Sequence, residues 1–200
     1  MKEGQIRFNS IIVSDHAPTD SRIEELKEWC GEFQKKKLTP EVDGNYTGNL
    51  SFRFKEGFVI TASGLKSKAN LAADCFVYVK EYEDQSNTFY VEGKKQPSSE
   101  SIMHYLIYRN CKDMNAVFHG HNDAIVAYAE KLGLHLTERK YESGTLELAR
   151  EVLKLLGDNK LIVLKNHGFV SLGRNMKEAG ELALVTLKRS KAAKLALSRN

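Results

Sequence analysis

The chain has few cysteines and no long hydrophobic run. Cys30, Cys75 and Cys111 are widely spaced, and an odd number of cysteines without a CxxC pair argues against a disulfide framework and against a cysteine zinc site. No stretch approaches the roughly 18 apolar residues of a membrane span, and the beginning, MKEGQIRFNS, lacks the apolar core of a signal peptide. We therefore expect reduced thiols in a cytoplasmic protein that has no membrane partner.

Acidic residues are missing from the last segment, KRSKAAKLALSRN (188–200), which contains five basic residues. Subtracting these five charges from the net charge of +4 leaves about −1 for the rest of the chain, so a wide basic surface for nucleic acid is not predicted. We interpret the segment as a solvated helix whose cations lie near the negative end of the helix dipole. A binding role for these cations is the alternative.

The composition and the order of predicted elements indicate one α/β domain over residues 1–200. Of the 200 residues, 42% are hydrophobic and 28% charged, as in globular proteins. Apolar residues at helical spacing predict helices at 20–37, 97–110, 123–132, 144–157 and 175–198. Strand-like runs lie at 50–54, 58–62, 73–82, 88–93, 115–120 and 160–168. This order favours a three-layer α/β/α sandwich around a mostly antiparallel central sheet.

Two histidines stand one residue apart at the end of a predicted strand, in NAVFHGHND (115–123). Strand side chains alternate between faces, so His119 and His121 point to the same side, and Gly120 between them leaves room. His167 ends a second predicted strand and also precedes a glycine. If the two strand ends meet, three imidazoles converge with one position open, which is the pattern of a catalytic zinc site. Polar side chains at strand ends without a metal are the alternative.

Three short segments are rich in hydroxyl, amide and glycine groups: YTGNLS (46–51), TASG (61–64) and PSSE (97–100). Ser98 and Ser99 lie at a predicted helix start, where free N–H groups favour an anion. Together the segments can surround a phosphate, whereas turn or cap chemistry is the ordinary role of each one alone.

Glu100 follows these serines in the first turn of the predicted helix. A carboxylate at this position complements the positive end of the helix dipole. If the histidines lie close by, Glu100 is instead a metal ligand or a proton acceptor.

The order of the motifs GNYTGNLS, VITASG, QPSSE, MHYLIYRN, NAVFHGH and LKNHG resembles that of the class II aldolase/adducin family, over roughly residues 20–197. The resemblance implies a three-layer fold on an antiparallel sheet and a homotetramer with active sites between neighbouring subunits. It also implies a small phosphorylated sugar as substrate and one divalent metal ion per subunit. Zn²⁺ suits three imidazoles best, although cobalt, manganese or iron can occupy such a site.

The resemblance also assigns roles to individual residues. His119, His121 and His167 match the metal ligands, and Glu100 matches a catalytic glutamate that can bind the metal and then act as acid and base. His104 matches a position that the family often fills with histidine, and we expect it to pack there or to support the site. The residues that match the phosphate site are Thr47, Gly48, Asn49, Ser63, Gly64, Ser98 and Ser99.

The predicted activity is a retro-aldol cleavage of a small phosphorylated ketose, as in the fuculose-phosphate aldolases of this family. Zinc would polarise the ketose oxygens and stabilise the enediolate that the cleavage leaves, while Glu100 moves the proton. An epimerase or a dehydratase using the same site is one alternative. A non-catalytic, adducin-like interaction module is another, although the presence of all three histidines and the glutamate favours an enzyme.

Three features depart from the family pattern. No tyrosine follows Tyr141, whereas aldolase members have one near the C-terminus. The short segment 136–145 offers Glu138 and Tyr141 as acid–base candidates, although a surface salt bridge is the simpler role for Glu138. Polar Asn122 and Asp123 follow the second histidine of the pair. Asp123 either caps the next helix or takes part in catalysis.

Overall fold

The centre of the molecule is a nine-stranded sheet with the strand order β1-β7-β6-β5-β4-β8-β11-β10-β9. The structure is a computed structural model and describes residues 4–197. The strands are β1 (Asn9–Ser14), β4 (Asn49–Phe54), β5 (Gly57–Thr61), β6 (Phe76–Glu83), β7 (Thr88–Glu92), β8 (Ala116–Gly120), β9 (His135–Leu136), β10 (Leu161–Leu164) and β11 (Gly168–Gly173). The outermost pairs, β1 with β7 and β9 with β10, are parallel, and the neighbours between them are antiparallel. A small separate ribbon pairs β2 (Glu41–Val42) with β3 (Asn45–Tyr46).

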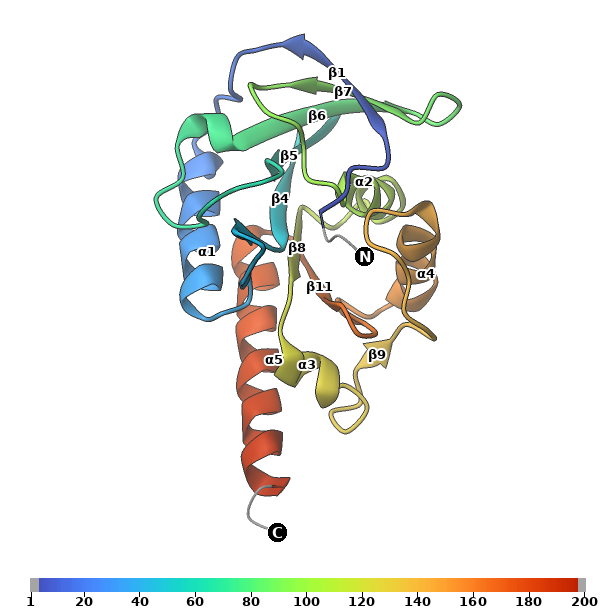
Figure 1. The fold of residues 1–200 in the computed structure, drawn as a ribbon. Helices are drawn as coiled ribbons and strands as arrows, with labels where there is room; N and C mark the ends of the chain where they lie inside the picture. The colour runs from blue at the N-terminus through green and yellow to red at the C-terminus, as the bar shows by residue number, and fades with distance from the viewer. Residues whose placement is uncertain (1–3, 198–200) are drawn as a thin grey trace.

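Helices cover both faces of this sheet (Figure 1). The helices are α1 (Arg22–Lys35), α2 (Ser101–Asn110), α3 (Asp123–Ala127), α4 (Leu146–Leu156) and α5 (Met176–Leu197), with a short 3₁₀ turn, η1 (Ala73–Cys75). Helices α1 and α5 pack together on one face, and α2 packs with α4 on the other. The C-terminal part of α5 extends past the sheet (Figure 1). The predicted three-layer α/β/α architecture with a mostly antiparallel sheet is confirmed.

Helix α4 shows how the sequence determines these elements. Leu148, Val152 and Leu156 recur at helical spacing, and their side chains are buried on one face of the helix. Thr145 caps the start, because its hydroxyl accepts a hydrogen bond from the Leu148 N–H. Gly157 ends the helix with a positive φ of 42°, a conformation that glycine adopts without steric cost.

Several predicted elements have different boundaries in the structure, among them the following three. The helix predicted from 97 begins at Ser101, because Pro97 bridges to Ala62 and the following residues turn. The helix predicted for 123–132 ends at Ala127 and continues as turns up to Gly133. The strand predicted for 160–168 ends at Leu164, and a turn follows in which Asn166 has a φ of 56°.

Strands β9 and β11 and the β2–β3 ribbon were not predicted from the sequence, and neither was strand β1. It pairs with β7 at the edge of the sheet, and its apolar residues are largely exposed, with Ile11 at 47% and Val13 at 49%. Such a strand has no inward-facing apolar stripe, so its sequence does not show the alternation that a half-buried strand requires.

The basic C-terminal segment lies on α5. Lys188, Lys191 and Lys194 are exposed, and Arg189 donates a hydrogen bond to the Leu132 carbonyl at 3.3 Å. The interpretation as a solvated helix therefore fits the segment up to Leu197, while residues 198–200 lie outside the described residues. Within residues 4–197, no helix combines the length and the apolar character that crossing a membrane requires.

Gly57 is a position where the β4–β5 hairpin closely approaches β6. A methyl group at Gly57 would lie 1.9 Å from the Val79 carbonyl oxygen, beside the bulge at which β6 shifts its register against β7. We expect Gly57→Ala to lower the free energy of unfolding by about 1–3 kcal/mol, the usual effect of overpacking. Urea denaturation measures this change.

Gly31→Ala is the matched control for this prediction. Gly31 lies inside α1, and an added methyl group would meet nothing within 4 Å. Alanine there should raise the free energy of unfolding by about 0.5–1 kcal/mol. Equal stability of Gly57→Ala and the wild type would contradict the close approach of the strands.

Candidate active site

Three neighbouring strands and one helix start bring four potential metal ligands together. His119 lies in β8, opposite Asn49 of β4 on one side and Val170 of β11 on the other. His121 directly follows β8, and Glu100 is the N-cap residue of α2. One ligand atom from each of Glu100, His119, His121 and His167 lies within 4.8 Å of all the others.

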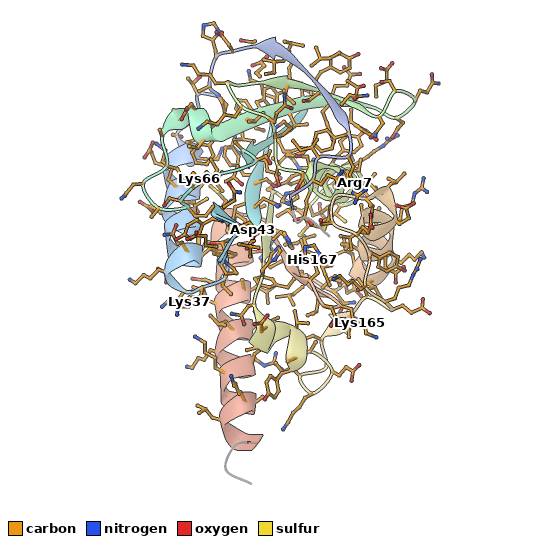
Figure 2. The ribbon with its side chains drawn as sticks, viewed as in Figure 1. Arg7, Lys37, Asp43, Lys66, Lys165 and His167 are labelled. Carbon is orange, nitrogen blue, oxygen red and sulfur yellow. The ribbon has the colours of Figure 1, made fainter. Side chains whose placement is uncertain are left out.

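His167 enters this cluster from a turn. It follows β10 by three residues and precedes β11, so it lies in the hairpin between them rather than at a strand end as predicted. In Figure 2 it lies in the middle of the molecule, between the α1–α5 side and the α2–α4 side. The antiparallel pairing of β11 with β8 places the start of β11 beside the end of β8. This pairing brings the third histidine to the first two.

The ring of His119 is oriented by the protein backbone. Its Nδ1 lies 2.8 Å from the Phe169 carbonyl, which can only accept, so Nδ1 donates the hydrogen bond. In the neutral ring, Nε2 therefore carries the lone pair. That atom lies 2.8 Å from His121 Nε2 and 2.8 Å from Glu100 Oε2. Such backbone support of a histidine is typical of metal ligands.

Two glycines permit the close packing around these rings. A methyl group at Gly120 would lie 2.7 Å from the Phe169 ring and 2.8 Å from the Leu38 carbonyl oxygen. At Gly168 it would lie 2.3 Å from the Gly120 carbonyl oxygen and 3.3 Å from the His119 ring. The glycines of HGH and NHG therefore allow β8 and β11 to approach each other at the site.

Glu100 is a buried carboxylate, 4% exposed. Burial alone would raise its pKa, but the charges of His119 and His167 outweigh burial and hold the pKa well below its ordinary value. Oε1 lies 3.6 Å from His167 Nε2 and accepts no hydrogen bond from the described residues. The sequence predicts Glu100 in the first turn of a helix, whereas in the structure it is the residue immediately before α2. Its side chain makes no cap hydrogen bond.

This donor set fits a divalent metal ion. Three imidazoles and one carboxylate are the ligand types that zinc and the neighbouring transition metals accept. The four side chains are buried or half-buried, and their donor atoms converge on a common point. The local alternative of polar side chains at separate strand ends does not describe this arrangement. The assignment of the four residues as ligands nevertheless stays a prediction.

A chain of buried hydrogen bonds supports Glu100 from the α2 side. The Asn49 amide donates to Glu100 Oε2 at 3.1 Å, and Asn49 Oδ1 lies 2.6 Å from His104 Nε2. On the other side of that ring, His104 Nδ1 lies 2.7 Å from Ser51 Oγ, which is 2.8 Å from the Tyr108 hydroxyl. His104 therefore has the supporting position that its place in the motif suggested.

The protons in this chain can be assigned. Burial, with a further contribution from the charge of His119, lowers the pKa of His104 to about 3, so its ring is neutral. Its single N–H is on Nε2, because Asn49 Oδ1 can only accept. Nδ1 then accepts from the Ser51 hydroxyl, and Tyr108 donates to Ser51. The chain thereby fixes the Asn49 amide with its N–H groups toward Glu100.

Ser51→Ala tests this chain. Alanine leaves His104 Nδ1 and the Tyr108 hydroxyl without their buried partner, so we expect the free energy of unfolding to fall by about 1–3 kcal/mol in urea denaturation. Ser190→Ala is the matched control. Ser190 is also fully buried, but its hydroxyl only adds a bond to the Thr186 carbonyl one turn earlier in α5. Its loss should change the stability by less than about 1 kcal/mol. An equal effect of the two variants would contradict the assigned chain.

The predicted phosphate residues surround one cavity of about 150 Å³ beside the four ligands. The cavity is lined by Thr47, Gly48, Asn49, Ser63, Gly64, Ser98 and Ser99, and also by Glu100 and His121. Gly48 and Gly64 have φ values of 69° and 68°, which glycine readily adopts. The Thr47 hydroxyl donates to the Pro40 carbonyl at 2.9 Å and so holds its own loop. The structure thus brings all seven residues together, and their binding of phosphate stays a prediction.

Besides Asp43, Asn45 and Ser143, sequence reasoning missed one buried polar residue of this cavity, Lys68. Its side chain is 1% exposed and lines the cavity. The available signal was a lysine within the small polar residues of SGLKSKAN, directly after the TASG motif. Burial of that lysine depends on tertiary packing, which the local pattern does not contain.

The other acid–base candidates, Asp123, Glu138 and Tyr141, do not line this cavity. Asp123 is exposed and is not the cap of α3, because the Asn122 side chain accepts the hydrogen bonds from Ala124 and Ile125. Asp123 lines a second, more open cavity beside His167. Glu138 is exposed, and Tyr141 is half-buried against the core, with the Arg139 guanidinium 4.8 Å from its ring centre.

The chain is similar to known proteins in sequence and in fold. The family model described as "Class II Aldolase and Adducin N-terminal domain" matches residues 24–193. A 5-deoxy-D-ribulose 1-phosphate aldolase of Bacillus thuringiensis serovar kurstaki is 27% identical over 180 residues, which cover 80% of each chain. An L-fuculose phosphate aldolase of Methanococcus maripaludis is 33% identical over 146 residues, covering 66% of this chain and 76% of that protein. A solved L-fuculose 1-phosphate aldolase shares the fold with a TM-score of 0.74 at 23% identity, over 92% of this chain and 90% of that one.

Proposed function

Because the chain belongs to the class II aldolase and adducin family, we propose that it is a metal-dependent lyase that cleaves a small phosphorylated ketose by a retro-aldol reaction. The observation that carries this proposal is the convergence of Glu100 with three histidines beside the cavity of the predicted phosphate loops. The activities named for the similar proteins support the same reaction type, because both curated relatives are sugar-phosphate aldolases.

His119, His121, His167 and Glu100 are the residues that would hold the metal. When bound, a divalent ion supplies positive charge that withdraws electrons from the oxygens of a ketose. The loops around Gly48, Gly64 and Ser99 hold the phosphate and thereby fix the ketose relative to the four ligands, so that positioning contributes to catalysis.

Glu100 carries the proton in this proposal. A hydroxyl of the leaving fragment loses its proton and becomes the aldehyde carbonyl, while the electrons of the broken carbon–carbon bond stay on the ketose fragment. That fragment is then protonated, so the reaction needs no oxidant and no reductant. The low pKa of Glu100 keeps its carboxylate ionised, which is the form that can accept a proton.

We further propose Zn²⁺ as the metal, one ion per subunit, because imidazole-rich sites suit zinc. We propose a homotetramer of single-domain subunits with active sites at their interfaces, on the basis of family membership. A cytoplasmic location is the proposal most consistent with three free cysteine thiols.

Incubation with a panel of phosphorylated pentuloses, hexuloses and their deoxy forms, followed by mass spectrometry, tests this function. We expect a triose-sized phosphate and an aldehyde whose masses together equal that of the substrate. An isomer of unchanged mass would indicate an epimerase, and loss of one water molecule a dehydratase. Absence of turnover by the metal-loaded protein across the panel would reject the lyase and favour an interaction module.

A further inference from the structure

Lys68 is a buried lysine that lines the predicted phosphate cavity. The side chain is 1% exposed, and it lines the same cavity as Ser63 and Ser99. Its Nζ donates a hydrogen bond of 2.7 Å to the carbonyl oxygen of Gly48, in the loop that precedes β4. Across residues 4–197, Nζ has no further hydrogen-bond acceptor and no carboxylate within ion-pair distance. Two of its three N–H donors are therefore available to a ligand.

The charge of Lys68 is unusual for its surroundings. Burying an ammonium group without a carboxylate partner is costly. Burial lowers the pKa of Lys68 to about 8, against smaller opposing contributions from Cys30, Cys75 and Glu100. The group is therefore still charged at neutral pH, although the fold gives it no fixed anion. A retained charge with spare donors at a cavity wall is suited to an anionic ligand.

The other groups predicted to bind phosphate are neutral. They are serine and threonine hydroxyls, the Asn49 amide and backbone N–H groups. Lys68 is the one lysine or arginine among the described residues that line this cavity. Without it, the two negative charges of a phosphate monoester would face neutral donors and the carboxylates of Asp43 and Glu100.

We propose that Lys68 is the charged donor of the phosphate subsite: its ammonium group binds the phosphate dianion, while its bond to Gly48 holds the surrounding loop. This inference rests on the proposed function, which places a phosphate in the cavity. It makes Lys68 a specificity residue that favours phosphorylated ketoses over unphosphorylated ones. A charge-assisted hydrogen bond in a buried site gives such discrimination.

Titration calorimetry with inorganic phosphate on the full-length, metal-loaded protein tests the proposal. Lys68→Met removes both the charge and the donor. Lys68→Gln removes the charge but keeps an amide donor for the Gly48 carbonyl. Lys66→Met is the matched control, because Lys66 is an exposed lysine of the same loop that lies toward α1 in Figure 2. Thermal unfolding of each variant reports whether the fold is intact.

We expect both Lys68 variants to bind phosphate about 10- to 100-fold more weakly, as for the loss of a charge-assisted hydrogen bond. The KM for a phosphorylated ketose should rise similarly, with a smaller change in kcat, and Lys66→Met should stay within about twofold. Because Lys68 is an unpaired buried charge, its replacement should not lower the Tm by more than a few degrees. A purely structural lysine would instead lower the Tm and leave phosphate affinity unchanged.

Three results would overturn the inference. The first is wild-type affinity for phosphate in a folded Lys68→Met protein. The second is wild-type affinity in Lys68→Gln alone, which would reduce the role of Lys68 to holding the loop. The third is no binding of phosphate by the wild type. Phosphate binding that depends on Lys68, without turnover of any ketose phosphate, would instead reject the proposed function and support this subsite.

Discussion

Replacing His121 with alanine is expected to remove the metal and to reduce kcat/KM by at least about 10³-fold. The substitution takes away one of three imidazoles whose donor atoms lie within 4.8 Å of one another and of Glu100. Loss of a metal that stabilises developing charge raises the barrier by several kcal/mol, and about 4 kcal/mol corresponds to this factor. Metal content of the purified protein and steady-state kinetics with the ketose phosphate identified in the substrate panel measure the two effects.

His16→Ala is the control for this substitution. The His16 side chain is 90% exposed and lies on the turn after β1, so its loss should change neither metal content nor turnover. A chelator gives a second, activity-independent readout, because a metal that binds the folded state raises the Tm. Chelation should lower the Tm of the wild type and of His16→Ala, and leave that of His121→Ala unchanged. Full metal content in His121→Ala would remove His121 from the ligand set.

The histidine pair could be predicted from the sequence because its geometry is local. Residues i and i+2 of a strand share a face, and His119 and His121 indeed point into one cluster. His167 is different, because only the pairing of β11 with β8 brings it there. The order of motifs supplied this long-range information. The turn that holds His167 could not be predicted in the same way, since KLIVLKNHG reads as one continuous strand.

Caps and buried charges were harder to predict than the elements themselves. Asn122 and Asp123 are both good N-cap residues, and the structure selects Asn122. The choice depends on whether the helix after β8 begins one residue earlier or later, and no local pattern determines this. Lys68 was missed for a related reason: lysines are mostly exposed, so a sequence pattern assigns it to the surface, whereas packing of its loop places it at the cavity wall.

Glu100→Gln is the second substitution with a large expected effect, a fall in kcat of about 10²- to 10⁴-fold, the range of a lost general acid or base. Glutamine has the shape of glutamate and can still accept the hydrogen bond from the Asn49 amide. It cannot accept a proton at neutral pH, so the variant separates proton transfer from the architecture of the site. Because the phosphate cavity and the histidines are unchanged, KM should change far less than kcat.

Glu151→Gln is a closely matched control, because Glu151 is also a buried glutamate, 7% exposed, on α4 with Lys154 as its partner. It should keep wild-type kcat, and metal analysis of both variants shows whether the ligand set survives. A Glu100→Gln protein that retains metal and more than about a tenth of the wild-type kcat would show that another group carries the proton. Asp123 would then be the first residue to test, because it lines a cavity together with His167. Glu100 accepts a hydrogen bond from Asn49 and faces two of the histidines, so it is the residue that we propose to carry the proton. If Asp123 does not carry the proton, Asp123→Asn should leave kcat within about tenfold of the wild type.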